Sequence, residues 1–403
     1  MKQLSGGVCA AKGFTAAGIH CGIKKNSSKK DLALIKSAKP ASAAAVYTTN
    51  LVKGAPIYIT KSNVADGKAQ AMICNSGNAN TCNANGIEIA EGVCKLAAKH
   101  LQLAATDIIV ASTGVIGQEM SLLPFEAHMG ELVSALGDYP QDAAAAIMTT
   151  DTCRKEWAVA FELAGKTCTI GGMAKGSGMI NPNMATMLVF LTTDAAISPA
   201  MLRQALSADT KDSFNMISVD GDTSTNDMCC ILANGMAGNP EITAEGPDFE
   251  AFKAALAAVT VPLCKMMAKD GEGATKLIAC TVTGAVDKPT AATIAKTVID
   301  SNLVKAAMFG ADANWGRVLC AIGYSGPDVD IGKIDVVFAS AAGRIAVCKN
   351  GAGLPFSEES AKTVLLEDEI TIEIALNAGD ATATAWGCDL TYDYVKINGD
   401  YRS

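Results

Sequence analysis

The chain has 403 residues, a net charge of −8 and few aromatic residues. At this length we expect one large domain or two closely packed ones, and an apolar content of 49% is ample for a core. Aromatic residues make up only 5%, and the acidic chain has no long Lys/Arg run, so a nucleic acid or another polyanion is not expected as a partner.

Cysteine and histidine content bears on metal binding and cellular location. Fourteen Cys occur without a CxxC spacing, and His20, His100 and His128 have no ligand spacing, so we predict no metal site and no catalytic Ser-His-Asp triad. The N-terminus lacks the apolar core of a signal peptide, and no uncharged apolar stretch of 18 residues predicts a membrane span. Many thiols without an export signal are typical of a reducing cytoplasm, where we expect this protein.

The first half of the chain contains helix and strand patterns of ordinary length. The pairs Lys24-Lys25 and Lys29-Lys30 are interpreted as solvated loop charges. Residues 87–101 place apolar side chains on one helical face, and a buried strand is predicted directly after them at 107–111.

The second half is predicted to be richer in strands. Ser198 and Pro199 are typical of a helix start, and residues 249–269 have a helical pattern in which Pro262 should start, break or kink a segment. Strands are predicted at 277–283, 334–338, 344–348, 370–375 and 383–395, and the last two alternate as half-exposed antiparallel strands do. Strands gathered near the C-terminus, with helices between them, favour an α+β fold over a doubly wound sheet.

Three loops are rich in Gly, Asn and Asp, at 75–86, 218–227 and 270–276. These residue types tolerate left-handed backbone, so the loops could simply be turns. Several polar loops in an otherwise apolar chain are also typical of the walls of a functional site. The sequence leaves both interpretations open.

The most informative stretch is GGMAKGSGMINPNMATMLVFLTTD, residues 171–194. It places Thr186 where a Gly-rich loop enters the apolar run 187–191, a position that suits a nucleophile. If the chain is cut before Thr186, the new α-amine, with a pKa of about 7.7 to 8.0, can act as its base. Thr113 and Gly114 could offer a hydroxyl and an N–H to an oxyanion. Taken singly, these residues are better explained as ordinary strand ends.

The motifs taken together resemble the ornithine acetyltransferase family (glutamate N-acetyltransferase, bifunctional in some members) of arginine biosynthesis. The resemblance rests on five separated motifs, KGSGMINPNMATML, STGVIG, TTDT, DGEGATK and INGDYRS. GFTAAGIHCGIK at 13–24, DGDTSTND at 220–227 and ADANWGR at 311–317 extend it along the chain.

The resemblance implies an α+β fold of mixed sheets and helices that cleaves itself, shared with aminopeptidases of the DmpA type. Cleavage between Ala185 and Thr186 would give an α fragment (1–185) and a β fragment (186–403) that together form one site. Assembly into an (αβ)₂ heterotetramer is expected. No cofactor is expected, and neither is a membrane or nucleic-acid partner.

The resemblance also implies the reaction. Thr186 would carry the acetyl group from N-acetylornithine to glutamate in a ping-pong scheme, with Thr113 and Gly114 as the oxyanion pair. The implied substrate-binding residues are Thr152, Lys175, Thr186, Glu272, Asn398 and Ser403. Thr149 and Thr150 share the TTDT segment with Thr152, and Ser403 keeps a hydroxyl where many relatives have Thr.

Three questions stay open from the sequence. Acetyl-CoA could also be a donor, which would separate bifunctional from monofunctional members. Water could resolve the acyl-enzyme, which would make the protein an aminopeptidase or amidohydrolase. A third alternative is an uncut binding protein, against which the intact Ala185-Thr186 junction argues.

Overall fold

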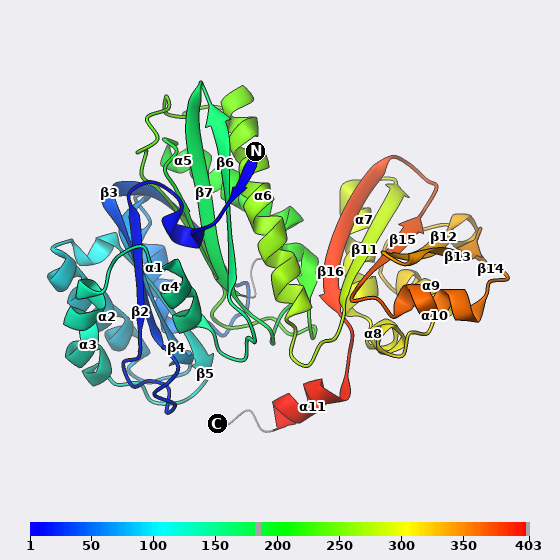
Figure 1. Ribbon diagram of the computed structural model, residues 1–403, viewed down its shortest axis with the longest axis horizontal. Coiled ribbons are helices and arrows are strands. Elements are labelled where there is room, and N and C mark those ends of the chain that lie inside the picture. Colours follow the sequence, from blue (N-terminus) through cyan, green and yellow to red (C-terminus); the bar gives the residue numbers. More distant parts are fainter. Residues whose placement is uncertain (182–186, 400–403) are drawn as a thin grey trace. The chain divides into compact units, whose positions relative to one another are not determined.

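A computed structural model describes residues 1–181 and 187–399. The chain forms two compact units, each with its own mixed sheet (Figure 1). The first unit contains residues 1–176, 187–215 and 223–263, and the second contains 177–181, 216–222 and 264–399. Helices and mixed sheets occur in both units, which confirms the predicted α+β class.

The first unit is built on a nine-stranded sheet in the order β1-β6-β7-β8-β10-β3-β4-β5, with β2 paired to β3. The pairs β8–β10 and β4–β5 are parallel and the others antiparallel. The strands are β1 (Lys2–Leu4), β2 (Phe14–Ile19), β3 (Leu32–Tyr47), β4 (Lys68–Asn78), β5 (Ile108–Val115), β6 (Lys155–Leu163), β7 (Lys166–Lys175), β8 (Leu188–Thr193) and β10 (Met228–Ala233).

Apolar side chains cover both faces of this sheet. Along β3, Leu32 and Leu34 belong to one core cluster, whereas Ala33 and Ile35 belong to another, as the two-residue period of a strand requires. Helices α2 and α3 contribute to the first of these clusters and α4 to the second. The helices of this unit are α1 (Ala55–Asn63), α2 (Gly86–Leu101), α3 (Leu123–Ser134), α4 (Pro140–Ile147) and α5 (Pro199–Asp212).

Helix α6 (Pro247–Lys269) is the one helix among the described residues that is long and apolar enough to cross a membrane. Its Phe252 ring packs edge-on against Phe161 of β6, with 6.2 Å between centroids. Gly172 of β7 has no side chain, so Val259 and Leu263 of the helix lie against the strand backbone. These contacts are those of a core helix that covers a sheet.

The second unit has a seven-stranded sheet in the order β14-β13-β12-β15-β11-β16-β9. The pairs β11–β15 and β16–β9 are parallel. The strands are β9 (Ile217–Ser218), β11 (Leu277–Ala285), β12 (Asp335–Ser340), β13 (Gly343–Lys349), β14 (Ala352–Gly353), β15 (Glu369–Ala375) and β16 (Ala381–Cys388). The helices are α7 (Lys288–Asp300), α8 (Asn302–Phe309), α9 (Trp315–Gly323), α10 (Glu358–Leu365) and α11 (Tyr392–Gly399). Short 3-10 helices in the chain are η1 (Gly7–Cys9), η2 (Ala105–Asp107), η3 (Phe214–Met216) and η4 (Ile331–Lys333).

Three predictions need correction. The strand predicted at 383–395 ends at Cys388, and α11 begins at Tyr392, because Asp389 turns back to accept hydrogen bonds from the Thr275 and Lys276 amides. Pro262 neither starts nor breaks a helical segment, because helix α6 runs through it; the predicted kink stays a prediction. The alternating strand β15 is parallel to β11 and antiparallel to β12, so it is not purely antiparallel.

Candidate active site

Thr113 and Gly114 lie at the end of β5, beside the end of β4. Gly114 has φ +131°, and a Cβ at this position would overlap the backbone of Gly77 and Asn78. Only glycine can therefore occupy the position without moving the neighbouring strand. The close approach of the two strands fixes the backbone at Thr113 and Gly114.

Lys175 is the last residue of β7 and is only 8% exposed. Its Nζ donates a hydrogen bond to Thr113 Oγ1 at 3.4 Å. In the β7–β8 ladder Lys175 is opposite Leu188, the first residue of β8. The first unit thus brings a cation and a hydroxyl together at the level where β8 begins.

Asp151, in the TTDT segment, anchors the loop next to Lys175. Its Oδ1 accepts hydrogen bonds from Lys155 Nζ and the Gly176 N–H, both at 2.7 Å, and its Oδ2 accepts from the Thr149 N–H at 2.9 Å. Burial alone would raise the pKa of Asp151, but the charges of Lys175 and Lys155 outweigh it and hold the pKa at about 2. Asp151 is therefore ionised at neutral pH; it lies in the TTDT motif, but the sequence did not single it out as a site residue.

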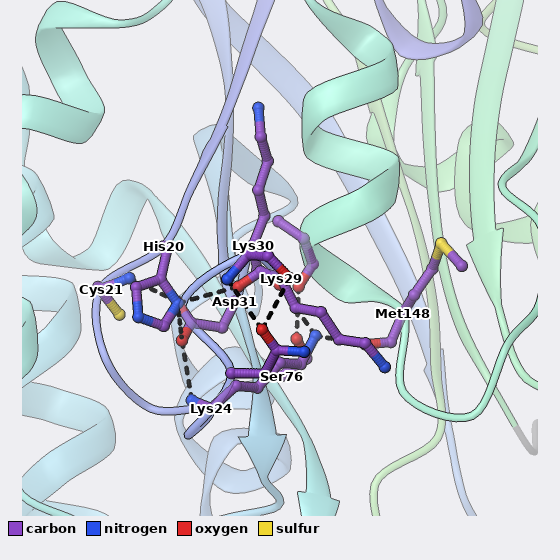
Figure 2. Close-up of polar contacts among 11 residues, drawn as sticks. His20, Cys21, Lys24, Lys29, Lys30, Asp31, Ser76 and Met148 are labelled. Carbon is purple, nitrogen blue, oxygen red and sulfur yellow. Dashed lines mark hydrogen bonds and ion pairs between the residues drawn. The ribbon is translucent and has the colours of Figure 1, made fainter.

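Lys24 supports the same segment and is not the solvated loop charge predicted from the sequence (Figure 2). Its Nζ donates to the Met148 carbonyl oxygen at 2.7 Å and to the Lys30 carbonyl oxygen at 2.9 Å. Burial lowers the pKa of Lys24 to about 8, against the opposing charge of Asp31. The buried Asp31 carboxylate accepts hydrogen bonds from the Cys21 and Lys24 amides and so closes the loop that carries this lysine.

Two of the Asn- and Gly-rich loops are hydrogen-bonded to each other and to the backbone of Ser112, the residue before Thr113. Asn226 Nδ2 donates to the Ser112 carbonyl oxygen at 2.9 Å and to the Ala79 carbonyl oxygen at 2.5 Å, while its Oδ1 accepts from Thr81 Oγ1 at 2.5 Å. Ser112 also donates through Oγ to Asn75 Oδ1 at 2.6 Å. Residues 75–81 and 223–227 therefore hold the strand end that carries Thr113.

Glu272 and Asn398 form a second group, within the second unit. Asn398 Nδ2 donates to Glu272 Oε2 at 2.7 Å, and the Glu272 N–H donates to the Ser177 carbonyl oxygen at 2.8 Å. The Glu272 carboxylate lies directly against Gly178, where a Cβ would overlap it. The DGEGATK loop thus presents a buried carboxylate whose orientation is set by the 177–178 backbone and by helix α11.

Further carboxylates surround this second group. Asp220 accepts hydrogen bonds from the Met179 N–H at 2.6 Å and the Ile180 N–H at 2.8 Å, and burial raises its pKa. Burial together with the charges of Asp220, Glu272 and Asp222 raises the pKa of Tyr394 on α11. This negative environment suits a cationic ligand group.

The remaining predicted site residues are placed as follows. Thr152 is exposed and follows Asp151 directly. Thr186, Ala185 and Ser403 lie outside the described residues. Within residues 1–181 and 187–399, no cluster of three or more His, Cys, Asp or Glu side chains could hold a metal ion.

Comparison with known proteins gives one family and several relatives that match nearly the whole chain. The profile of the ArgJ family matches residues 15–403. The chain is 52% identical to arginine biosynthesis bifunctional protein ArgJ of Symbiobacterium thermophilum, with all of both chains covered. It is 51% identical to ArgJ 1 of Clostridium acetobutylicum, covering 97% of this chain and 96% of the other. The crystal structure of ArgJ from Bacillus halodurans matches 52% of this chain and 97% of that one, at 50% identity and a TM-score of 0.50.

Proposed function

The chain belongs to the ArgJ family, and on this premise we propose how its residues carry out acetyl transfer. Membership makes it an acyltransferase of arginine biosynthesis, a glutamate N-acetyltransferase. We propose N-acetylornithine as the acetyl donor, glutamate as the acceptor and Thr186 as the carrier between them. The observation that carries the proposal is the hydrogen bond from the buried Lys175 to the half-buried Thr113, at the level where β8 begins.

The proposed first half-reaction acetylates Thr186. Its Oγ attacks the acetyl carbonyl carbon, the hydroxyl proton passes to the departing amine, and the C–N bond breaks to release ornithine. Negative charge develops on the carbonyl oxygen, and Thr113 Oγ and the Gly114 N–H would donate hydrogen bonds to it. In the second half-reaction the glutamate α-amine attacks the ester and releases the free Thr186 hydroxyl.

Charge complementarity supports separate roles for the two polar groups. Lys175 would hold the α-carboxylate that both substrates carry, with Thr152 and Ser403 as further substrate contacts. Glu272, oriented by Asn398, would receive the distal ammonium of the ornithine moiety. Glutamate has no distal cation, so this contact favours the donor.

We also propose that the chain cleaves itself before Thr186, that the fragments assemble as (αβ)₂ and that the protein works in the cytoplasm. The family relationship does not favour the aminopeptidase or the uncut binding protein. Whether acetyl-CoA is a second donor is decided by a rate assay with each donor alone. Light scattering that gives the mass of one α and one β fragment would contradict the assembly.

The reaction is tested by incubating the protein with N-acetylornithine alone. One acetyl group should appear on the peptide that begins at Thr186, and an equal amount of ornithine should be released. Ornithine release that requires glutamate would contradict the ping-pong scheme. Acetylornithine hydrolysis at the same rate without glutamate would instead identify a hydrolase.

A further inference from the structure

Lys24 links an N-terminal loop to the segment that leads toward Lys175, and the proposed reaction gives it no role. Its Nζ donates to the Met148 carbonyl oxygen at 2.7 Å and to the Lys30 carbonyl oxygen at 2.9 Å (Figure 2). Met148 follows the last residue of helix α4 and has extended backbone, with φ −65° and ψ 149°. The carbonyls at the C-terminus of a helix lack intrahelical partners and carry partial negative charge, so a cation suits this position.

The loop that carries Lys24 is tied to two strands of the first unit. Asp31 is fully buried, and its carboxylate accepts hydrogen bonds from the Cys21 N–H at 2.6 Å and the Lys24 N–H at 2.8 Å. The Asp31 N–H donates to the Ile19 carbonyl oxygen of β2, and the Asp31 carbonyl oxygen accepts from the Ser76 N–H of β4. The Lys24 side chain therefore extends from a backbone that is fixed to the sheet.

Strand β4 also holds the end of helix α4 at a second point. Ser76 Oγ donates to the carbonyl oxygen of Ala146, in the last turn of the helix. Cys74 lies on the same strand, and burial raises the pKa of its thiol while the charges of Lys175 and Lys24 oppose that shift. Both ammonium groups are thus near enough to one buried thiol to act on it. The end of α4 is fixed to β4 directly by Ser76 and, through its loop, by Lys24.

The segment that Lys24 holds ends at the residue that anchors Lys175. Asp151 lies three residues after Met148, and its Oδ1 accepts a hydrogen bond from the Gly176 N–H at 2.7 Å. Gly176 directly follows Lys175. Three residues span at most about 11 Å when fully extended, so fixing Met148 restricts where Asp151 can lie.

We propose that Lys24 is a positioning residue for binding of the substrate α-carboxylate. Its ammonium fixes the 148–152 segment, which carries Thr152 and, through Asp151, holds the backbone next to Lys175. The inference rests on the proposed function, in which Lys175 binds the α-carboxylate of both substrates and Thr152 is a further contact. Without the ammonium the segment gains conformational freedom, and ordering it again when a substrate binds costs affinity.

The test compares Lys24→Met with Lys25→Met. Methionine keeps an unbranched apolar stem and removes the ammonium, and Lys25 is the exposed neighbour of Lys24, which makes it a matched control. Glutamate binding is measured by calorimetry, which requires no acetyl transfer. Single-turnover acetylation is followed at several concentrations of N-acetylornithine, and Lys175→Met is the reference for loss of the carboxylate contact.

For Lys24→Met we expect about tenfold weaker glutamate binding and an about tenfold higher half-saturating concentration of N-acetylornithine. The acetylation rate at saturation should stay within about threefold of the unsubstituted protein. Lys25→Met should match the unsubstituted protein in all three. A side chain that only stabilises the fold would lower the Tm and leave the affinity of the folded protein unchanged. Unchanged affinity for either substrate would therefore overturn the proposal, and so would a loss confined to the rate at saturation.

The role of Lys24 and the proposed function can fail separately. If Lys175→Met weakens glutamate binding and Lys24→Met does not, the role of Lys24 is wrong and the proposed function stands. If Lys24→Met weakens binding but N-acetylornithine never acetylates the unsubstituted protein, the proposed reaction is wrong and the positioning role is retained. If Lys24→Met does not fold, Lys24→Gln replaces it under the same affinity criteria, because its amide keeps a donor on a side chain one atom shorter.

Discussion

Lys175 lies near two carboxyl groups whose pKa values are shifted in opposite directions. Asp151, with a pKa of about 2, is ionised and hydrogen-bonded to Lys155, whereas burial raises the pKa of Asp227 well above its usual range. The two lysines and Asp151 together carry one net positive charge. That charge is not cancelled within the group, so it can act on an anionic ligand. An α-carboxylate, common to both proposed substrates, is such a ligand.

Glu272→Gln and Lys175→Met should therefore fail in different ways. Glu272→Gln keeps the size but removes the charge, so acetylation of Thr186 by N-acetylornithine should weaken by about 1.5 to 3 kcal/mol, or tenfold to over a hundredfold in kcat/KM. Deacylation by glutamate should change less or improve. Lys175→Met should impair both steps. The two steps are measured separately, as single-turnover acetylation of Thr186 and as its deacylation by glutamate. Equal losses in both steps for Glu272→Gln would contradict the proposal that Glu272 binds the distal ammonium of ornithine.

Thr113→Ala should lower the acetylation rate about a hundredfold, because it removes one proposed donor to the oxyanion. Thr113→Ser keeps the hydroxyl and is the matched control, which should retain most of the rate. The measurement is the rate at saturating N-acetylornithine, where loss of ground-state binding has little effect. A Thr113→Ala protein as fast as Thr113→Ser would show that the hydroxyl is not a donor to the transition state.

The sequence identified the site residues only through combined motifs. Thr113, Gly114 and Lys175 could be named because the motifs around them were recognised together, and the structure brings these three into one region. Lys24 was misjudged, since a lysine pair in a loop is normally solvated and only the fold shows the Met148 carbonyl that receives its amine. Asp151 lay inside a recognised motif, yet its partners are set by β6 and β7.

At the scale of the elements, helices and strands were predicted correctly where the apolar residues had a clear period. A strand rich in alanine was missed, because alanine gives a weak periodic signal. The helix at 87–101 and the strand at 370–375 match α2 and β15 within about one residue. Strand β3 was not predicted, because its sequence is rich in Ala and contains Pro40, both poor in strands. The structure places Pro40 at a shift of the β3–β4 register between Lys36 and Ala41, where a ladder hydrogen bond is not needed.

Asp209 should make stability depend on pH through the contact of α5 with α6. Burial raises its pKa from 3.8 to about 7, against hydrogen bonds from Thr260 and Ser213. The folded protein then binds this proton more tightly than the unfolded chain does. The stabilisation that protonated Asp209 adds to the free energy of unfolding is therefore complete below pH 4 and is lost as the pH rises to 7. At about 1.4 kcal/mol per pKa unit, the stability lost through Asp209 over this pH range is at most about 4 kcal/mol.

The Asp209→Asn protein should therefore lose less stability than the unsubstituted protein between pH 4 and 7. Denaturant unfolding at several pH values measures the difference. Asp66→Asn, at an exposed aspartate, is the control and should follow the unsubstituted curve. Parallel curves for Asp209→Asn and the unsubstituted protein would contradict the raised pKa.

At the scale of the whole molecule, the proposed fragments do not coincide with the two compact units. The nine-stranded sheet of the first unit takes β8 and β10 from the C-terminal side of residue 186 and its other seven strands from the N-terminal side. Strand β8 pairs with β7 from Lys175 and Leu188 to Ile170 and Thr193, and β10 pairs with β3 over six residues. Fragments of 185 and 218 residues would thus share one sheet.

The last prediction concerns cleavage and its consequence for assembly. We expect the purified protein to consist of two fragments, the second beginning at Thr186, that run as one particle in native buffer. They should separate only in denaturant, because parting them requires breaking the β7–β8 and β3–β10 ladders in the middle of the sheet.

Intact mass and N-terminal sequencing measure the cut, and size exclusion with and without denaturant measures the association. Thr186→Ala should remain one chain of 403 residues without acetyl transfer, whereas Thr186→Ser keeps a hydroxyl and should still cut. The uncut Thr186→Ala chain should elute in native buffer like the cut protein, since the ladders on both sides of the junction are the same. A full-length protein with full activity would contradict self-cleavage, and fragments that separate in native buffer would contradict the shared sheet.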